Sequence, residues 1–278
     1  MTLARQDRIS RKLVRTVLIV GLALLAAVPL YYVLVSSFKN SADMALHPLS
    51  LPSSWDFANY VQAAADGTIF RSLLNSLIVT VVGVLFQIII GSLAAYGMLL
   101  KKNVLTSAVG VVLLIAFTIP LQATLLPLFK LEADANLVDS LAGLIVIYLG
   151  GAVFCYFLTV GYMRQLPWEL FEAARIDGAG YFRIYWSICL PLIRPILATV
   201  AVFQALGTWN DFITPNVFIS SPQNRTVVLQ VYNAVTQFTT NWPLFMAIIV
   251  IALIPVVVFF IICQRWIVSG LVSGAVKG

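Results

Sequence analysis

Long runs of uncharged, apolar residues are the feature that most restricts how this chain can fold. Residues 16–38 contain no charged side chain and lie between Arg15 and Lys39. A helix needs about 20 predominantly apolar residues to cross the hydrocarbon core of a bilayer. The sequence therefore predicts an all-α membrane protein with six transmembrane helices. The expected spans are residues 16–38, 72–100, 103–129, 140–163, 194–214 and 243–264.

The composition supports a chain that lipid covers. The 278 residues are 61% hydrophobic and only 10% charged, whereas soluble domains are about 45–50% apolar and about 25% charged. No segment resembles a soluble domain or a linker, so a single transmembrane domain over residues 1–278 is expected. One histidine, His47, and three widely spaced cysteines predict no metal site.

Basic residues gather on one side of the expected bundle. The termini and the loops on their side hold 13 of the 17 Lys and Arg residues, with a net charge of +9 against −3 for the opposite side. Because basic segments are retained in the cytoplasm, both termini are expected to be cytoplasmic. The segments 39–71, 130–139 and 215–242 would then face outward. The net charge of +6 is thus a topology signal, and no nucleic-acid partner is expected.

A cytoplasmic loop over residues 166–191 is long for a connection between two spans. Pro167 suits the start of a helix because its missing N–H group costs nothing there. Gly178 lies where a left-handed residue is expected to end the first helix, and Pro191 is expected to end a second helix. The loop therefore predicts two short helices with a bend between them.

The same loop is expected to expose large side chains beside small alanines. These large residues are Phe171, Ile176, Phe182, Tyr185 and Trp186. On physical grounds alone, they fit two arrangements equally well. The helices would lie in the groove of a partner protein, or they would rest on lipid headgroups as interfacial amphipathic helices.

The spacing of several residues in this loop is similar to that of a known family. Glu172-Ala173-Ala174 is followed by three residues, Gly178, nine residues and Ile188-x-Leu190-Pro191. This spacing matches the EAA loop of bacterial ABC importer permeases at every fixed position. The chain around it resembles the carbohydrate importers, specifically the smaller maltose-permease-like subunit. The similar features are Ser37-Phe38-Lys39, Asn75-Ser76, Ala94-Ala95-Tyr96, Pro120, Pro127, Ile176-Asp177-Gly178-Ala179, Trp209-Asn210-Asp211-Phe212 and the closing run from Gln264 to Gly278.

The resemblance implies a type I ABC importer permease fold with cytoplasmic coupling helices. It implies a complex with a second homologous permease subunit, two ATPase subunits and an extracytoplasmic substrate-binding protein in a bacterial or archaeal plasma membrane. The residues that would dock on the ATPase are Glu172, Ala173, Ala174, Asp177 and Gly178, with Lys277 and Gly278 of the carboxyl tail as a second contact.

The sequence carries no motif for catalysis. It has no G-x-x-x-x-G-K-[ST] phosphate loop, no H-E-x-x-H and no G-x-S-x-G. No catalytic residue and no cofactor of its own are therefore expected, and ATP and Mg²⁺ would bind to the partner ATPase. An intramembrane enzyme or an assembly factor is a remote alternative. Such a protein would need buried catalytic acids or histidines, and Asp211 is the only acidic residue near an expected span.

Polar residues at membrane depth are costly and need a reason. A sugar-binding site supplies hydrogen bonds to the sugar hydroxyls and an aromatic ring for its apolar face. The sequence Trp209-Asn210-Asp211 offers both within one helical turn. The favoured alternative is that these residues pair helices or close an outer gate, because the resemblance implies that the larger partner subunit of a maltose-type pair supplies most sugar contacts. The residues expected along the translocation path are Asn75, Gln122, Gln204, Trp209, Asn210 and Asp211, while Gln87 and Tyr156 are further polar candidates.

The outward segment 215–242 is too long and polar for a minimal turn. By resemblance it would contact the substrate-binding protein through Asn224, Arg225, Gln230 and Tyr232, although a plain loop over the bundle mouth fits as well. The expected solute is a di- or oligosaccharide. Glycerol phosphate or another polyol is the alternative, which the near absence of Lys and Arg inside the spans disfavours.

Overall fold

The computed structural model describes residues 3–65, 67–100, 103–237 and 241–275, and over these ranges the chain is helical with no strand. The elements in chain order are α1 (Leu3–Ser36), α2 (Ser41–Leu46), α3 (Ala58–Ala64), α4 (Thr68–Leu100), α5 (Val104–Thr118), α6 (Leu121–Asp134), α7 (Leu141–Tyr148), η1 (Leu149–Gly151), α8 (Ala152–Met163), α9 (Glu169–Ile176), α10 (Tyr181–Ile184), η2 (Tyr185–Cys189), α11 (Leu190–Asn210), α12 (Ile213–Phe218), η3 (Pro222–Asn224), α13 (Val227–Gln237) and α14 (Trp242–Ala275).

The described helices confirm the expected all-α class and supply five or six candidate membrane spans, although the fifth runs from Tyr181 to Asn210 and not over 194–214. Five segments are long and apolar enough to cross a bilayer, and a sixth candidate is the pair α5 and α6, which is bent by 104°. Counted as one span, this pair brings the total to six. The five unbroken segments are Lys12–Ser36, Thr68–Leu100, Leu141–Met163, Tyr181–Asn210 and Trp242–Gln264.

The bend between α5 and α6 has a local cause. Ile119 is extended, with φ −81° and ψ 118°, because a residue that precedes a proline avoids the helical region. Pro120 then starts α6. The expected continuous span over 103–129 is therefore broken at Pro120, as a helix-ending proline would do.

Pro191 does not end a helix, which corrects the expectation from the sequence. The helical segment runs from Tyr181 to Asn210 without a break. A π-helical turn, η2, precedes α11, and Pro191 falls in the first turn of α11. A π turn changes the hydrogen-bonding register of a helix, so the missing N–H group of Pro191 is accommodated within it.

Contacts divide the chain into two compact units. The first comprises residues 1–69 and 231–254, and the second comprises residues 70–230 and 255–278. The expected single domain stays a prediction, and each unit is described by itself.

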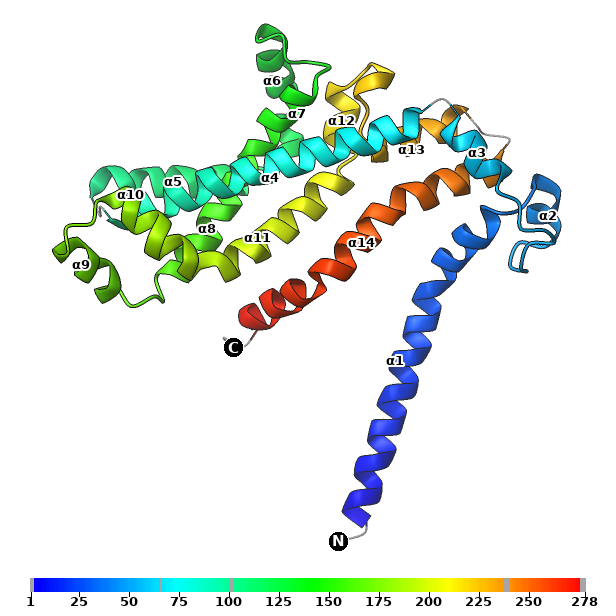
Figure 1. Ribbon diagram of the computed structural model, residues 1–278, viewed down its shortest axis with the longest axis horizontal. Helices are drawn as coiled ribbons and strands as arrows, with labels where there is room; N and C mark the ends of the chain where they lie inside the picture. The colour runs from blue at the N-terminus through cyan, green and yellow to red at the C-terminus, as the bar shows by residue number, and fades with distance from the viewer. Residues whose placement is uncertain (1–2, 66, 101–102, 238–240, 276–278) are drawn as a thin grey trace. The chain divides into compact units, whose positions relative to one another are not determined.

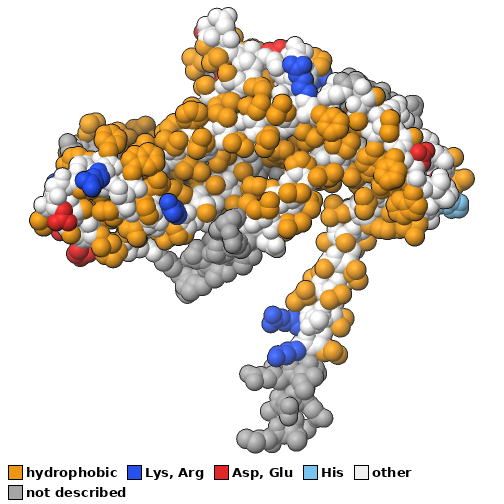
Figure 2. Space-filling model, viewed as in Figure 1, with side chains coloured by type: hydrophobic (Ala, Val, Ile, Leu, Met, Phe, Trp, Pro, Cys, Tyr) orange, Lys and Arg blue, Asp and Glu red, His pale blue; other side chains and the backbone are white. Residues whose placement is uncertain are grey.

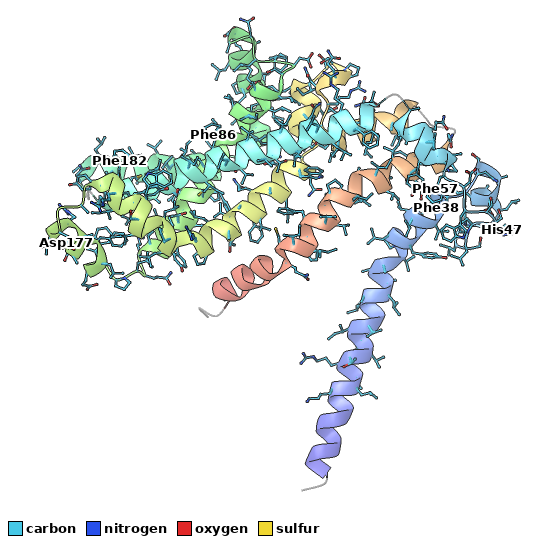
Figure 3. All side chains as sticks on the ribbon, in the orientation of Figure 1. Phe38, His47, Phe57, Phe86, Asp177 and Phe182 are labelled. Carbon is cyan, nitrogen blue, oxygen red and sulfur yellow. The ribbon has the colours of Figure 1, made fainter. Side chains whose placement is uncertain are left out.

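In the first unit, the segment that follows the long helix α1 folds around an aromatic cluster. The Phe38 ring lies about 5 Å from the rings of Trp55, Phe57 and Tyr60, and Figure 3 shows Phe38 and Phe57 close together. Lys39 is only 2% exposed, and its Nζ donates a hydrogen bond to the carbonyl oxygen of His47 at 2.5 Å. A buried ammonium group needs such acceptors, so Lys39 holds the segment after α1 in place.

The second unit holds the bundle from α4 to α12. One core cluster contains Cys155 and Val200, and a second contains Leu144 and Phe218. Gly91 allows α4 and α8 to approach closely, because a Cβ there would lie 2.6 Å from the carbonyl oxygen of Ala152. In Figure 1, α9 and α10 lie at the left-hand end of this unit, away from α6 and α12. Hydrophobic side chains cover most of its visible face in Figure 2, as a lipid-covered bundle requires.

Candidate functional site

The loop between α8 and α11 forms the two helices and the bend that the sequence predicts. Helix α9 ends at Ile176, and Gly178 follows with a φ of +79°, a left-handed conformation that glycine adopts without strain. Helix α10 begins at Tyr181. Two acidic residues, Glu169 and Glu172, lie in the first turn of α9, where the helix dipole favours negative charge.

The side chains that this loop exposes differ in part from those expected. Ile176 and Phe182 are 86% and 77% exposed, and Trp186 is also exposed. Phe171 and Tyr185, by contrast, are almost fully buried, so the prediction that they are exposed is wrong. Both occupy the sides of their helices that face the bundle, and they belong to its larger core cluster.

The expected coupling residues are placed unequally. Glu172, Ala173, Asp177 and Gly178 are exposed, whereas Ala174 is buried against the bundle. Figure 3 shows Asp177 and Phe182 at the end of the unit where α9 and α10 lie. Lys277 and Gly278 lie outside the described residues.

Tyrosines attach the loop to α4. The Tyr185 hydroxyl lies 2.7 Å from the hydroxyl of Ser92, and the Tyr96 hydroxyl donates to the carbonyl oxygen of Tyr181 at 3.0 Å. The rings of Tyr96 and Tyr185 are 5.4 Å apart. A force on α9 and α10 would therefore reach α4 through buried contacts.

A polar cavity of about 630 Å³ lies deeper in the same unit, beside the break between α5 and α6. Gln122, Gln204, Asn210 and Asp211 all line it, so the structure brings four of the expected path residues together. Gln122 and Asn210 are exposed, and the Asn210 amide donates to the carbonyl oxygen of Leu206 in its own helix. Further polar lining residues are Gln87, Thr124, Tyr148 and Thr208.

Two of the polar residues around this cavity also hold helices together. The Gln87 amide donates to the carbonyl oxygen of Tyr148 at 2.6 Å. Asp211 accepts a hydrogen bond from the Tyr148 hydroxyl at 2.9 Å and another from the backbone N–H of Ile213. The cavity wall is thus fixed by its own hydrogen bonds, while the Gln122 side chain is exposed at the cavity.

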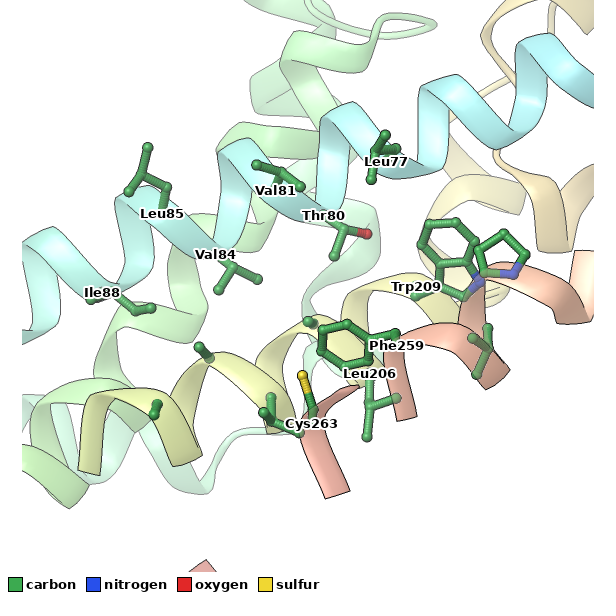
Figure 4. Close-up of a pocket in the computed structure, with 16 residues that line it drawn as sticks. Leu77, Thr80, Val81, Val84, Leu85, Ile88, Leu206, Trp209, Phe259 and Cys263 are labelled. Carbon is green, nitrogen blue, oxygen red and sulfur yellow. The ribbon is translucent and has the colours of Figure 1, made fainter. Parts of the chain in front are cut away.

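Trp209 does not share this cavity. It lines a separate cavity of about 510 Å³ between α4, α11 and α14, together with Val84, Leu206 and Phe259 (Figure 4). Successive helical residues point about 100° apart, which turns Trp209 away from Asn210. The expected combination of an aromatic face and polar groups at Trp209-Asn210-Asp211 is therefore split between two cavities.

Asn75 joins α4 to the segment before α13 through hydrogen bonds. Its amide donates to the carbonyl oxygens of Gln223 and Arg225, both at 2.9 Å, and it is only 6% exposed. The neighbouring Ser76 accepts from the backbone N–H of Val227 at 2.8 Å. These bonds fasten the segment before α13 to α4, so Asn75 lies away from the polar cavity.

The expected contact residues for a binding protein are dispersed over the outward segment. Asn224 donates to the carbonyl oxygen of Asp139 at 2.6 Å, and Arg225 approaches Gln230 at 3.5 Å. Tyr232 is 51% exposed on α13. A role in contacting a partner stays a prediction for all four.

Sequence reasoning missed two acidic residues. Asp139 has a φ of +58°, and its Oδ1 accepts from the backbone N–H groups of Ser220 and Ser221, both at 3.0 Å. Glu132 is only 5% exposed, and its carboxyl oxygens make no hydrogen bond within the described residues. Glu132 belongs to α6, half of the bent span, so Asp211 is not the only acidic residue near a span. The sequence of the outward segment 130–139 does not indicate that Glu132 is buried or that Asp139 binds the backbone of Ser220 and Ser221.

Comparison with known proteins gives one consistent family. The family described as binding-protein-dependent transport system inner membrane component matches residues 87–272. The probable starch degradation products transport system permease protein AmyC of Thermoanaerobacterium thermosulfurigenes is 36% identical, over 96% of this chain and 97% of the relative. The melibiose/raffinose/stachyose import permease protein MelC of Bacillus subtilis is 33% identical, over 90% of this chain and 91% of the relative.

The solved structures agree with this family. A chain from the crystal structure of a bacterial ABC transporter involved in the import of the acidic polysaccharide alginate is similar, with a TM-score of 0.82 and 27% identity. The similarity covers 94% of this chain and 97% of that chain.

Proposed function

Because this chain belongs to the binding-protein-dependent transport system inner membrane components, we propose that it forms half of the translocation pathway of an ATP-driven sugar importer. The observation that carries the proposal is the exposed turn between α9 and α10, which Tyr185 ties to α4. A turn attached in this way transmits movement from a partner into the bundle. The chain is a non-catalytic, multi-pass membrane subunit.

The motor belongs to partner subunits. ATP and Mg²⁺ bind to two ATPase subunits, one of which receives α9 through Glu172, Ala173 and Asp177, while Ala174 packs inward. ATP binding favours one arrangement of this chain and a second, homologous permease, and the coupling helices carry that preference into the membrane. Solute moves when the favoured arrangement changes.

The solute is a di- or oligosaccharide. The polar cavity offers amide groups from Gln122 and Asn210 for hydroxyls, and Phe117 supplies an aromatic surface. The relatives from Thermoanaerobacterium thermosulfurigenes and Bacillus subtilis bear the names of starch-product and melibiose permeases, which supports the sugar class. Glycerol phosphate is disfavoured, because the described lining holds Asp211 and no Lys or Arg.

The sidedness follows from charge. Basic segments are retained in the cytoplasm, and Arg164, Arg175 and Arg183 belong to the segment that carries α9 and α10. Both termini are then cytoplasmic in a bacterial or archaeal plasma membrane. The segment with Asn224 and Arg225 faces outward, where an extracytoplasmic binding protein delivers the solute.

A matched pair of glycine variants tests the coupling helices. Gly178 has a positive φ and Gly180 has a φ of −70°, and neither has a neighbour within 4 Å of a built Cβ. Gly178→Val should insert into membranes normally but retain less ATPase on purification, because valine disfavours the left-handed turn. Gly180→Val is the control and should retain the ATPase. Equal retention and equal sugar uptake in both variants would contradict the proposal.

A further inference from the structure

A third cavity, of about 400 Å³, lies between the first half of α5 and the second half of α8. Its polar lining residues are Thr106, Ser107, Tyr156 and Arg164. Tyr156 is one of the further polar candidates named from the sequence, but none of the six residues expected along the translocation path and none of the expected ATPase contacts lines it. The cavity is therefore distinct from the polar cavity of the proposed path.

Tyr156 brings an unsatisfied polar group to this cavity. Its side chain is only 7% exposed, and its hydroxyl makes no hydrogen bond within the described residues. The hydroxyl lies 3.7 Å from the position that a Cβ on Gly110 would take, so it faces the cleft toward α5. The hydroxyl is not one of the fully buried, unpaired side-chain atoms of the described residues, so it is reached from the cavity, where a ligand oxygen would accept its hydrogen bond.

Arg164 brings a positive charge to the same cavity. It caps the carboxyl end of α8, and its guanidinium makes no ion pair or hydrogen bond in the part of the chain that the structure describes. Guanidinium groups bind phosphate through paired hydrogen bonds. No acidic side chain is among the lining residues, so the charge favours an anionic ligand.

The remaining walls are apolar. Leu99, Val111, Leu114 and Val160 line the cavity, and Val111 and Leu114 are 56% and 51% exposed on α5. A ligand that satisfies Arg164 and also covers these side chains must be amphipathic. Basic pockets between transmembrane helices near the cytoplasmic surface bind the headgroups of anionic lipids.

We propose that this cavity binds an anionic phospholipid. The phosphodiester lies against Arg164, the Tyr156 hydroxyl donates to a phosphate or ester oxygen, and the first acyl carbons cover Val111 and Leu114. The lipid would pack on the core cluster that also contains Phe171 of α9. Lipid binding at this cavity does not depend on the proposed transport function.

Lipid binding to the purified, assembled complex tests the proposal. Phosphatidylglycerol, phosphatidylcholine and inorganic phosphate are added separately to delipidated complex, and bound lipid is counted by native mass spectrometry. Phosphatidylglycerol should be retained preferentially. Arg164→Gln should weaken its apparent affinity at this site about tenfold or more, and Tyr156→Phe about threefold to tenfold, as the loss of a charged and a neutral hydrogen bond predicts.

Two further variants control the experiment. Arg183→Gln removes an exposed charge from the same loop without touching the cavity, and it should retain phosphatidylglycerol at the wild-type level. Arg164→Lys preserves the charge and should retain more lipid than Arg164→Gln, which keeps the test decisive if Arg164→Gln fails to assemble. Equal retention of phosphatidylcholine, or unchanged retention in both Arg164 variants, would overturn the proposal. Full displacement of the lipid by inorganic phosphate would assign the site to a soluble anion instead.

Discussion

The side-chain nitrogen of Gln204 on α11 lies 2.9 Å from the side-chain oxygen of Gln87 on α4. The same nitrogen donates to the carbonyl oxygen of Gly151 at 3.0 Å, and Gln87 donates to that of Tyr148. Two polar side chains at membrane depth thereby satisfy each other and join three helical segments. They also line the polar cavity, so the wall of the proposed path is built from the bonds that hold the bundle.

Gln204→Leu should destabilise the bundle. The variant leaves the Gln87 oxygen and the Gly151 carbonyl without their donor, and an unsatisfied buried group costs about 1–3 kcal/mol. The thermal midpoint of the purified complex should fall. Adding Gln87→Leu should cost less than the sum of the two single effects, because both partners of one hydrogen bond are then gone. Strictly additive effects would show that the pair does not interact.

Asn210 and Trp209 give a second prediction, because these neighbours line different cavities. Asn210→Ala should raise the KM for sugar uptake by about tenfold, as expected for a lost hydrogen bond of about 1–1.5 kcal/mol. Trp209→Leu keeps an apolar side chain in an apolar cavity and should change the KM much less. Uptake in proteoliposomes with saturating binding protein measures both. A larger effect at Trp209 than at Asn210 would move the solute to the apolar cavity.

Much of the fold could be predicted from local sequence. Apolar runs longer than a bilayer is thick predict the spans, and the left-handed turn at Gly178 follows from a glycine placed after a short helix. The break at Pro120 follows from the restriction that proline imposes on the residue before it. Each of these features depends on a few neighbouring residues.

The rest depends on partners that are distant in sequence. Phe171 and Tyr185 are buried because the ends of α4 and α8 lie under them, and composition does not reveal this. Gln87 could be identified as a polar residue at membrane depth, but its partner is 117 positions away. The separation of Trp209 from Asn210 could be predicted from the sequence, because successive residues of a helix point about 100° apart.

Gly91 gives a third prediction, which concerns the contact between α4 and α8. A Cβ at Gly91 would lie 2.6 Å from both the carbonyl oxygen of Ala152 and the Cβ of Cys155, whereas a Cβ at Gly97 meets nothing within 4 Å. Gly91→Ala should therefore destabilise the complex by about 1–3 kcal/mol through overpacking. Gly97→Ala, in the same helix, should be neutral or stabilise it by about 0.5–1 kcal/mol. Thermal unfolding of both variants checks the contact, and equal midpoints would contradict it.

Asp139 gives a prediction for the pH dependence of stability. Partial desolvation raises its pKa, but the hydrogen bonds that it accepts from Ser221 and Ser220 outweigh this effect and hold the pKa below its usual range. A carboxyl whose pKa is lowered by folding stabilises the folded state above its unfolded pKa, about 3.9. That contribution is lost as the pH falls through the lower, folded value.

The matched variant is Asp139→Asn, which tolerates the left-handed backbone and keeps an acceptor oxygen but removes the charge. The thermal midpoint of the wild type should exceed that of the variant at pH 7, and the difference should shrink as the pH falls below about 4. Asp134→Asn is the control, because the Asp134 side chain is exposed on α6, and its midpoint should stay close to that of the wild type at pH 7. If the difference in thermal midpoint between the wild type and Asp139→Asn stays constant down to pH 3, the charge of Asp139 does not stabilise its contact with Ser220 and Ser221.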